Sequence, residues 1–220
     1  MQARKKTIAI DVDDVLFAHT DALCLYHNKL HGTSLKVSDF FSYEFWQVWG
    51  GSREECQAKM ESFYESAEFL NTKPIRGSQE AIDVLSSKFN LYVVTSRSHT
   101  LKDQTLQWIH TYFPGKFEQV LFGNHYGKTG ERKTKSAMCM EIQAVALVDD
   151  SLHYALDVTA HGVHCVLFDL DSTYSWSNHA NYSKNYQKEV REDDHKHVIT
   201  RVSDWPQVVK TLEQRFLGDE

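Results

Sequence analysis

The chain lacks three features that would mark other classes of protein. No apolar run approaches the roughly 20 residues of a membrane-spanning helix, so a membrane protein is not expected. The formal net charge of −6 provides no basic excess, which argues against a general binder of nucleic-acid polymers or membrane surfaces. The first residues, MQARKK, lead directly into a strand-like run, whereas a secretory signal has a long apolar stretch. We therefore expect a cytoplasmic location.

Cysteine is also scarce, and its spacing excludes two kinds of small scaffold. The four cysteines are scattered and form no C-x-x-C pair; they are Cys24, Cys56, Cys139 and Cys165. Neither a disulfide framework nor a zinc ribbon is therefore expected, and a reducing compartment is favoured. The sequence has no internal repeat, and 220 residues suit one domain, alone or with a sizeable insertion.

What the chain does contain is a series of apolar, strand-like runs. They lie at residues 7–10, 91–95, 119–123, 144–148 and 163–168. The stretches between the later runs, such as 101–113 and 151–162, have helical periodicity. Continuous apolar strands that alternate with helices predict an α/β fold, a Rossmann-like parallel sheet with helices on both faces.

A long, aromatic-rich segment separates the first two predicted strands. Residues 18–73 are too many for a simple crossover, and SREE at 52–55 is a capping box that opens a helix. We interpret this segment as a helical cap inserted after the first strand, into a core made of residues 1–17 and 74–220. Gly77 then precedes the helix that returns to the second strand.

The C-terminal part has a different composition. Residues 171–197 are almost wholly polar, which predicts a surface insertion or loop rather than core. Residues 198–217 then predict a short strand and a closing helix, with Ser203 or Asp204 as its N-cap.

Chemistry-bearing residues follow the predicted strands. They are the acids of IAIDVDDVLF (Asp11, Asp13, Asp14), the group Thr95-Ser96-Arg97, a lysine in KTKSAM, and the pair Asp149-Asp150. In a parallel sheet the carboxyl ends of the strands form the ligand-binding edge, so these groups are expected to meet there.

That combination of groups suits phosphoryl transfer. Carboxylates bind Mg²⁺, which prefers oxygen ligands, and a carboxylate can attack phosphorus to form an aspartyl-phosphate. A second carboxyl can protonate the leaving oxygen and then activate water. Hydroxyls and a lysine neutralise the charge on the phosphoryl oxygens.

The ordered set resembles the haloacid dehalogenase (HAD) superfamily of phosphohydrolases. DVDDV is similar to the first motif of that superfamily, VVTSR to the second, the lysine of KTKS to the third and ALVDDS to the fourth. The resemblance implies Asp11 as nucleophile and metal ligand. It implies Asp13 as general acid/base, which also ligates the metal through its carbonyl group.

The later motifs carry the remaining implied roles. Thr95, with Ser96 beside it, would bind phosphate. Lys135 would hold the nucleophile and the phosphate together, and Lys133 is the alternative lysine. Asp150 would ligate Mg²⁺ directly, with Asp149 supporting it.

Within the superfamily, the likeness is greatest to the 5′(3′)-deoxyribonucleotidase group. That group has an early helical cap with an FW pair, which here is Phe45-Trp46 in YEFWQVW. The resemblance implies cap aromatics that sandwich a base. The alternative is that these rings form the core of the cap. His19 falls where the group has a phenylalanine that faces the base, and Asp14 replaces a usual glycine.

The sequence thus predicts a Mg²⁺-dependent phosphomonoesterase for a small phosphorylated metabolite, with a nucleoside monophosphate as the leading candidate. The expected substrate-binding residues are Thr95, Ser96, Arg97, Lys135, His19, Phe45 and Trp46; the expected metal site comprises Asp11, Asp13, Asp149 and Asp150. For Arg97 the alternative is a surface charge.

Other functions stay open at this point. The same motifs would serve a phosphatase, phosphotransferase or mutase for a sugar or other phosphate. A non-catalytic phosphate-binding protein is the alternative from a different class. We expect no nucleic-acid polymer or membrane as partner, and a monomer or homodimer.

Overall fold

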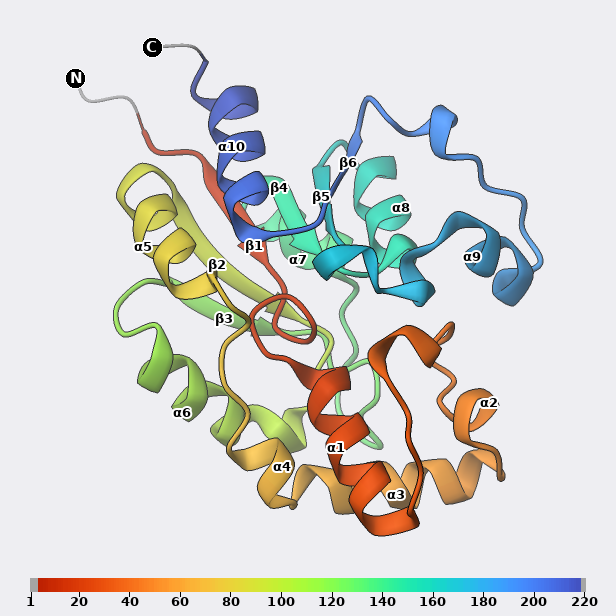
Figure 1. Cartoon of the computed structure of the whole chain (residues 1–220). Helices are drawn as coiled ribbons and strands as arrows, with labels where there is room; N and C mark the ends of the chain where they lie inside the picture. The colour runs from red at the N-terminus through yellow and green to blue at the C-terminus, as the bar shows by residue number, and fades with distance from the viewer. Residues whose placement is uncertain (1–3, 219–220) are drawn as a thin grey trace.

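A six-stranded parallel sheet forms the centre of the molecule (Figure 1), and the computed structural model describes residues 4–218. The strands are β1 (Thr7–Ile10), β2 (Asn90–Thr95), β3 (Gln119–Phe122), β4 (Ala144–Asp149), β5 (His164–Phe168) and β6 (Ile199–Val202). Their order is β3-β2-β1-β4-β5-β6, and each neighbouring pair is parallel. The predicted α/β fold with a Rossmann-like parallel sheet is confirmed.

Helices connect the strands and surround the sheet. They are α1 (His19–His31), α2 (Trp46–Trp49), α3 (Arg53–Tyr64), α4 (Ala67–Leu70), α5 (Ser78–Lys88), α6 (Lys102–Tyr112), α7 (Lys135–Glu141), α8 (Leu152–Ala160), α9 (His179–Tyr186) and α10 (Trp205–Phe216). Helices α1–α4 come from the predicted cap segment and gather at the end of the sheet away from both termini (Figure 1). The loop that follows β1 points toward them.

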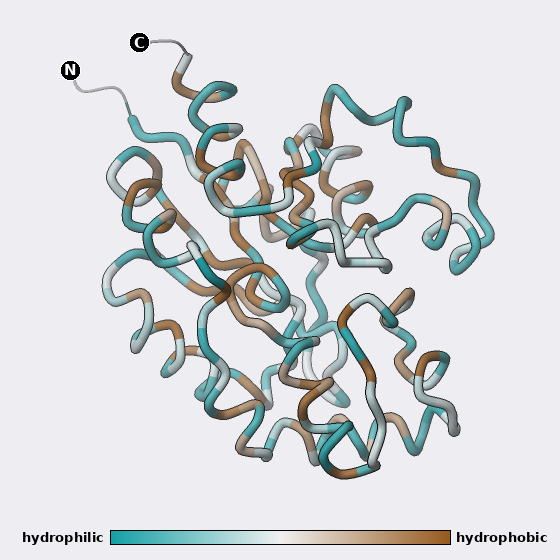
Figure 2. The backbone as a smooth tube through the Cα atoms, in the orientation of Figure 1, coloured by the Kyte–Doolittle hydropathy of each residue, from teal (hydrophilic) through white to brown (hydrophobic). Residues whose placement is uncertain are grey.

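The strand side chains alternate between two hydrophobic clusters. Ile8 and Ile10 of β1 belong to the cluster that includes α5, α6 and α10, whereas Ala9 belongs to the cluster formed with α7 and α8. Since successive strand residues point to opposite faces, helices cover the sheet on both sides. Figure 2 shows the hydrophobic colours concentrated on the strands and the inner helix faces.

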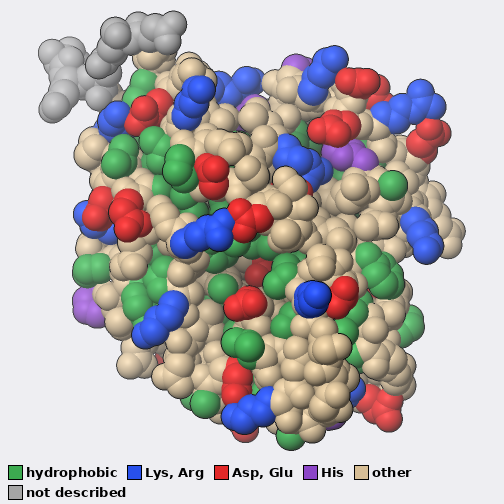
Figure 3. Space-filling model, in the orientation of Figure 1, with side chains coloured by type: hydrophobic (Ala, Val, Ile, Leu, Met, Phe, Trp, Pro, Cys, Tyr) green, Lys and Arg blue, Asp and Glu red, His purple; other side chains and the backbone are tan. Residues whose placement is uncertain are grey.

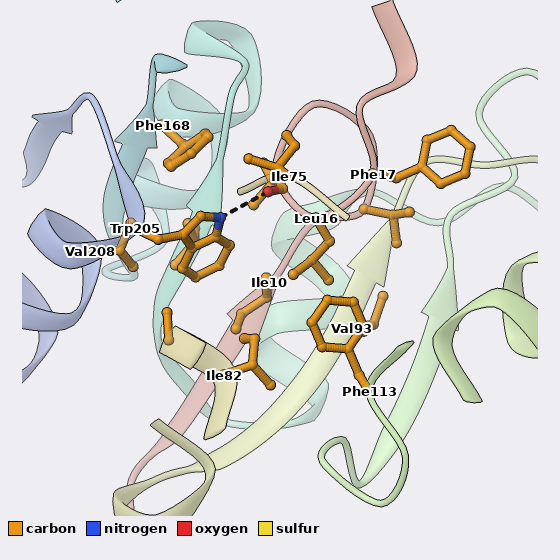
Figure 4. Packing of buried hydrophobic residues seen from close by; sticks show 14 of the residues in the cluster. Ile10, Leu16, Phe17, Ile75, Ile82, Val93, Phe113, Phe168, Trp205 and Val208 are labelled. Carbon is orange, nitrogen blue, oxygen red and sulfur yellow. Dashed lines mark hydrogen bonds between the residues drawn. The ribbon is translucent and has the colours of Figure 1, made fainter. Parts of the chain in front are cut away.

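Trp205 ties the closing helix to the loop after β1. Its side chain is fully buried, and its Nε1 donates to the carbonyl oxygen of Val15 at 3.2 Å (Figure 4). Asp204 is the N-cap of α10, because its carboxylate accepts from the amide of Gln207 at 2.8 Å. The sequence had left Ser203 and Asp204 as alternatives. The hydrogen bond from the buried Trp205 to Val15 therefore fixes the base of the loop that carries Asp13.

Two predicted helix starts are confirmed. Ser52 caps α3 by accepting from the amide of Glu55, whose side chain accepts in return from the amide of Ser52. Gly77 precedes α5 with a positive φ of 78°, a conformation that glycine adopts without steric cost.

The polar segment 171–197 contains short 3-10 turns, including η4 (Ser175–Ser177), and helix α9. Figure 2 shows hydrophilic colours along most of its outer course between α9 and β6. Some of its aromatic side chains are nevertheless buried, among them Tyr174 and Trp176, whose rings stack 4.4 Å apart. Buried aromatic residues therefore hold this segment against the rest of the molecule, although its overall composition is polar.

Surface features agree with the composition. Acidic and basic side chains are interspersed on the face drawn in Figure 3. Within residues 4–218, no helix has both the length and the apolar character needed to cross a membrane. The four cysteines carry free thiols and are buried.

A buried histidine predicts a pH effect on stability. His164 of β5 is 5% exposed, and burial, with Arg215 nearby, lowers its pKa to about 4 from 6.5. Below about pH 6.5 the unfolded chain binds a proton at this residue and the folded chain does not, so stability falls as the pH falls toward 4. At about pH 5 this group should cost about 2 kcal/mol.

Urea unfolding of the wild type and of His164→Gln at about pH 7.5 and about pH 5 measures this effect. The wild type should lose about 2 kcal/mol more on acidification than the variant does. Equal losses in both proteins would show that His164 does not contribute.

Candidate active site

The candidate site lies where the strand order reverses, between β1 and β4. The amide of Asp11 donates to the carbonyl oxygen of Val148 at 3.0 Å, which continues the pairing of β1 with β4 by one residue. Asp149 is the last residue of β4, and Asp150 follows it. The sheet therefore brings the first and fourth sequence motifs together at its carboxyl edge, as the sequence predicted.

Lys135 lies between two of these carboxylates. It is the first residue of α7 and is fully buried, with Nζ 2.8 Å from Asp11 Oδ2 and 2.5 Å from Asp149 Oδ2. Lys133 instead forms a surface ion pair with Glu141, and its side chain is 41% exposed. Of the two candidate lysines, the structure places Lys135 at the carboxylates.

Three carboxylates form a cluster that fits a divalent cation. Asp11, Asp149 and Asp150 each offer an oxygen, and these oxygens lie within 4.8 Å of one another. Oδ1 of Asp11 is buried and has no hydrogen-bond partner among the described residues. Three carboxylates and the single ammonium of Lys135 leave an excess of negative charge. Buried charge is costly unless an opposite charge compensates it, and a bound cation would do so here. An all-oxygen site of this charge suits Mg²⁺.

The pKa values of the acids reflect the same excess of negative charge. Burial raises the pKa of Asp11 to about 7; Asp149 and Asp13 add to the rise, and Lys135 opposes it. Burial also raises the pKa of Asp150 well above its ordinary value, with Asp149 as the next contribution. Positive charge is therefore what the cluster lacks.

Asp13 lies outside the cluster, in an ion pair with Arg97. The guanidinium contacts both carboxylate oxygens, with Nη2 2.6 Å from Oδ1 and Nε 3.0 Å from Oδ2. Burial would raise the pKa of Asp13, but the charge and hydrogen bonds of Arg97, together with the charges of His19 and Lys135, lower that pKa overall. Arg97 is itself 5% exposed, with its guanidinium over the ring of Phe17 at 4.5 Å. Its predicted contact with substrate stays a prediction.

The second motif presents two hydroxyls at the end of β2. Thr95 is fully buried, and its Oγ1 accepts from the amide of Arg97 at 3.2 Å. Ser96 is 9% exposed, and its buried Oγ has no hydrogen-bond partner within residues 4–218. An unpartnered hydroxyl beside buried acids suits an oxygen-rich ligand such as phosphate.

The predicted base-binding residues separate in the structure. His19 is buried at the start of α1, with its ring 6.4 Å from those of Phe45 and Tyr64. Burial lowers the pKa of His19, although the nearby charge of Asp13 opposes this. Trp46 instead donates from Nε1 to Glu44 at 2.7 Å. His19 therefore lies beside Phe45 and near Asp13, whereas the indole of Trp46 is hydrogen-bonded to Glu44.

Asp14 has a structural role that the sequence did not reveal. Its φ is 57°, in the left-handed region that glycine adopts without steric cost and that aspartate tolerates. Its carboxylate accepts from the amide of Thr20 at 2.9 Å and from the hydroxyl of Thr20 at 2.6 Å. Asp14 thus supports the N-terminus of α1 and fixes the turn that follows Asp13.

Sequence reasoning also missed the aromatic contact of Lys135. The Lys135 ammonium lies 4.3 Å from the ring centroid of Tyr154. His125 Nε2 lies 2.8 Å from the carbonyl oxygen of Lys133, which can only accept, so Nε2 carries the proton. The Tyr154 hydroxyl then donates to His125 Nδ1 at 2.9 Å. These two hydrogen bonds hold the Tyr154 ring in place over Lys135.

Two sequence comparisons agree with this geometry. The family model of the 5′ nucleotidase, deoxy (pyrimidine), cytosolic type C protein matches residues 5–126. A 5′(3′)-deoxyribonucleotidase of Clostridium acetobutylicum is 23% identical over 125 residues, 56% of this chain and 68% of the relative. The family match includes Asp11, Asp13 and Thr95. The structure adds Lys135 and the pair Asp149-Asp150 from outside that match.

Solved structures share the fold. A haloacid dehalogenase-like hydrolase of Streptococcus pneumoniae has a TM-score of 0.63 at 14% identity, covering 96% of this chain and 100% of that one. A HAD hydrolase of Bacillus subtilis, solved with bound magnesium, has a TM-score of 0.55 at 15% identity, covering 95% of this chain and 99% of that one.

The family model spans more than half of the chain, and solved haloacid dehalogenase-like hydrolases share its fold. The protein therefore belongs to the family of 5′ nucleotidase, deoxy (pyrimidine), cytosolic type C proteins, within the haloacid dehalogenase superfamily of phosphohydrolases.

Proposed function

We propose that the chain is a Mg²⁺-dependent phosphomonoesterase that transfers the phosphoryl group first to Asp11 and then to water. One observation carries this proposal: Asp11 is a buried carboxylate that Lys135 holds by one oxygen, while its other oxygen has no hydrogen-bond partner within residues 4–218. A carboxylate in this state is oriented and poorly solvated, which suits a nucleophile.

The proposed reaction has two steps. The Asp11 carboxylate attacks phosphorus, the bond from phosphorus to the leaving oxygen breaks, and Asp13 gives its proton to that oxygen. Asp13 then takes a proton from water, which attacks the phosphorus of the aspartyl-phosphate and releases inorganic phosphate and Asp11. The pair with Arg97 favours the carboxylate form of Asp13, which is the form that takes a proton from water in the second step. The proton gained there is the one that Asp13 gives to the leaving oxygen in the next turnover.

The remaining residues supply positioning and charge. Thr95, Ser96 and Lys135 would hold the phosphoryl oxygens. Mg²⁺ held by Asp11, Asp149 and Asp150, with the carbonyl group of Asp13, would supply further neutralisation of the phosphoryl charge.

We propose a nucleoside monophosphate as the substrate. The rings of His19, Phe45 and Tyr64 lie together in the segment 18–73, which we propose to be the cap. The charge of Asp13 acts on the pKa of both His19 and Tyr64, so both residues lie near the proposed acid/base. Aromatic rings favour a planar ligand such as a base. The name of the clostridial relative supports the same class of substrate.

Phosphate release from a substrate panel tests this function. The panel comprises nucleoside 5′- and 3′-monophosphates, sugar phosphates and an aryl phosphate, each with Mg²⁺ and with a chelator. We expect selective hydrolysis of nucleotides, lost with the chelator. Hydrolysis of sugar or aryl phosphates alone would keep the chemistry and reject the nucleotide. No hydrolysis with Mg²⁺ present would contradict the proposal. Asp11→Asn, purified in parallel, controls for contaminating phosphatases.

A further inference from the structure

One oxygen of Asp150 accepts hydrogen bonds from two residues that are distant in sequence. The hydroxyl of Tyr43 donates to Asp150 Oδ2 at 2.8 Å, and so does Nε1 of Trp176 at 2.8 Å. Tyr43 precedes α2, whereas Trp176 lies in η4. The two donors occupy Oδ2, so Oδ1 is the oxygen left for a ligand.

The indole of Trp176 is held firmly. It is 5% exposed and stacks on Tyr174 with an interplanar angle of 19°. The amide of Tyr174 donates in turn to Asp169 Oδ1 at 2.8 Å, and Asp169 pairs with Arg201 at 2.9 Å. This series of contacts connects the donor to the end of the sheet, so its direction does not depend on a mobile side chain.

The two segments that supply the donors also contact each other. Ser175 Oγ donates to the carbonyl oxygen of Ser38 at 2.8 Å, and Asn185 Nδ2 donates to that of Phe41 at 2.8 Å. Figure 1 shows the η4–α9 region facing the stretch between α1 and α2. Residues 38–43 and 175–185 therefore meet at Asp150.

We propose that Tyr43 and Trp176 are positioning residues that orient Asp150 for the divalent cation. Residues 38–43 and 175–185 thereby complete the metal site at the edge of the sheet. This inference rests on the proposed function, which takes Asp11, Asp149 and Asp150 as the cation ligands. Hydrogen-bond partners of a metal ligand fix its direction and its basicity, and their loss typically weakens metal affinity about 10- to 100-fold.

Magnesium binding to the full-length, chelator-treated protein tests the inference without an activity assay. Isothermal titration with MgCl₂ gives the Kd of the wild type, Tyr43→Phe and Trp176→Phe. Tyr43→Phe removes only the hydroxyl, so it keeps the fold, and its Kd should rise about 10- to 100-fold. Trp176→Phe should raise the Kd by a similar factor, and circular dichroism monitors its folding.

Tyr174→Phe is the matched control, because it removes a hydroxyl beside the same indole that forms no hydrogen bond with Asp150 in the described chain. Its Kd should equal that of the wild type. An equal effect of Tyr174→Phe and Tyr43→Phe would overturn the positioning role in favour of general packing. Wild-type affinity in Tyr43→Phe would overturn the inference and leave the proposed function intact. Absence of binding in the wild type would reject the metal site itself.

Discussion

Asp11→Asn is expected to lower kcat by roughly 10⁴- to 10⁶-fold, the range for removal of a group that acts as part of a catalytic unit. A neutral amide of the same shape can still accept from Lys135, but it is not a nucleophile. The loss should appear as phosphate release from the best substrate of the panel at saturating Mg²⁺. Activity within about tenfold of the wild type would reject Asp11 as the nucleophile.

The same variant should keep its fold and gain stability when metal is absent. The pKa of Asp11 is raised to about 7, so the folded state disfavours its charge at higher pH. Since a group with a raised folded pKa loses stability as the pH rises, the neutral amide removes a cost above pH 7. In chelator at about pH 8, thermal unfolding should therefore place the variant at or above the wild type.

Asp14→Asn is the matched control for this experiment. Asp14 is also a buried acid near the end of β1, but it contacts Thr20 and lies outside the carboxylate cluster. Asparagine tolerates the positive φ of 57° at this position. We expect Asp14→Asn to retain kcat within a few-fold. A large loss in Asp11→Asn alone would then be specific to Asp11, and not a general effect of removing a negative charge near the end of β1.

Lys135→Met is expected to have the largest effect on stability. Its Nζ lies against Asp11 and Asp149, both buried, so the variant leaves two carboxylates without their cation. Removal of one partner from a buried ion pair costs about 3–5 kcal/mol. Loss of this charge from the phosphoryl site should also lower kcat about 10²- to 10³-fold.

Urea unfolding in chelator and in excess MgCl₂ measures the stability effect. The loss should be large in chelator and smaller with Mg²⁺, which brings positive charge to the same carboxylates. Lys133→Met is the control: its surface pair with Glu141 should contribute at most about 1 kcal/mol. The assignment of the motif lysine fails if Lys133→Met inactivates the protein and Lys135→Met does not.

The sheet and the acids at its edge could be predicted from sequence because their signals are local. Asp11 and Asp149 each end a continuous apolar run, and parallel strands bring such ends to one edge. The lysine needed the structure, because Lys133 and Lys135 lie in the same short stretch. Only the start of α7 at Lys135 decides which of them faces the sheet.

Contacts between distant residues could not be predicted. Arg97 and Asp13 are 84 positions apart, and Tyr43 and Asp150 are 107 positions apart. Neither pair has a periodic signal, since each joins a loop to another loop. Trp176 lies in a segment that its composition predicts as surface, and burial of a single ring leaves no pattern in a polar sequence.

The most direct test of the central claim is to isolate the phosphoryl group on Asp11. Asp13→Asn should slow hydrolysis of the aspartyl-phosphate, because it removes the base that activates water. An aryl phosphate leaves without help from an acid, so the first step should still proceed. The variant is mixed with this substrate and Mg²⁺, quenched in acid, and its peptides are analysed by mass spectrometry.

We expect one added phosphoryl group, located on the peptide that contains Asp11. Borohydride reduction of that acyl phosphate should convert residue 11 to homoserine. The double variant Asp11→Asn with Asp13→Asn should show neither product. Hydrolysis of the aryl phosphate without a phosphorylated enzyme, or with the phosphoryl group on another residue, would contradict the proposed mechanism.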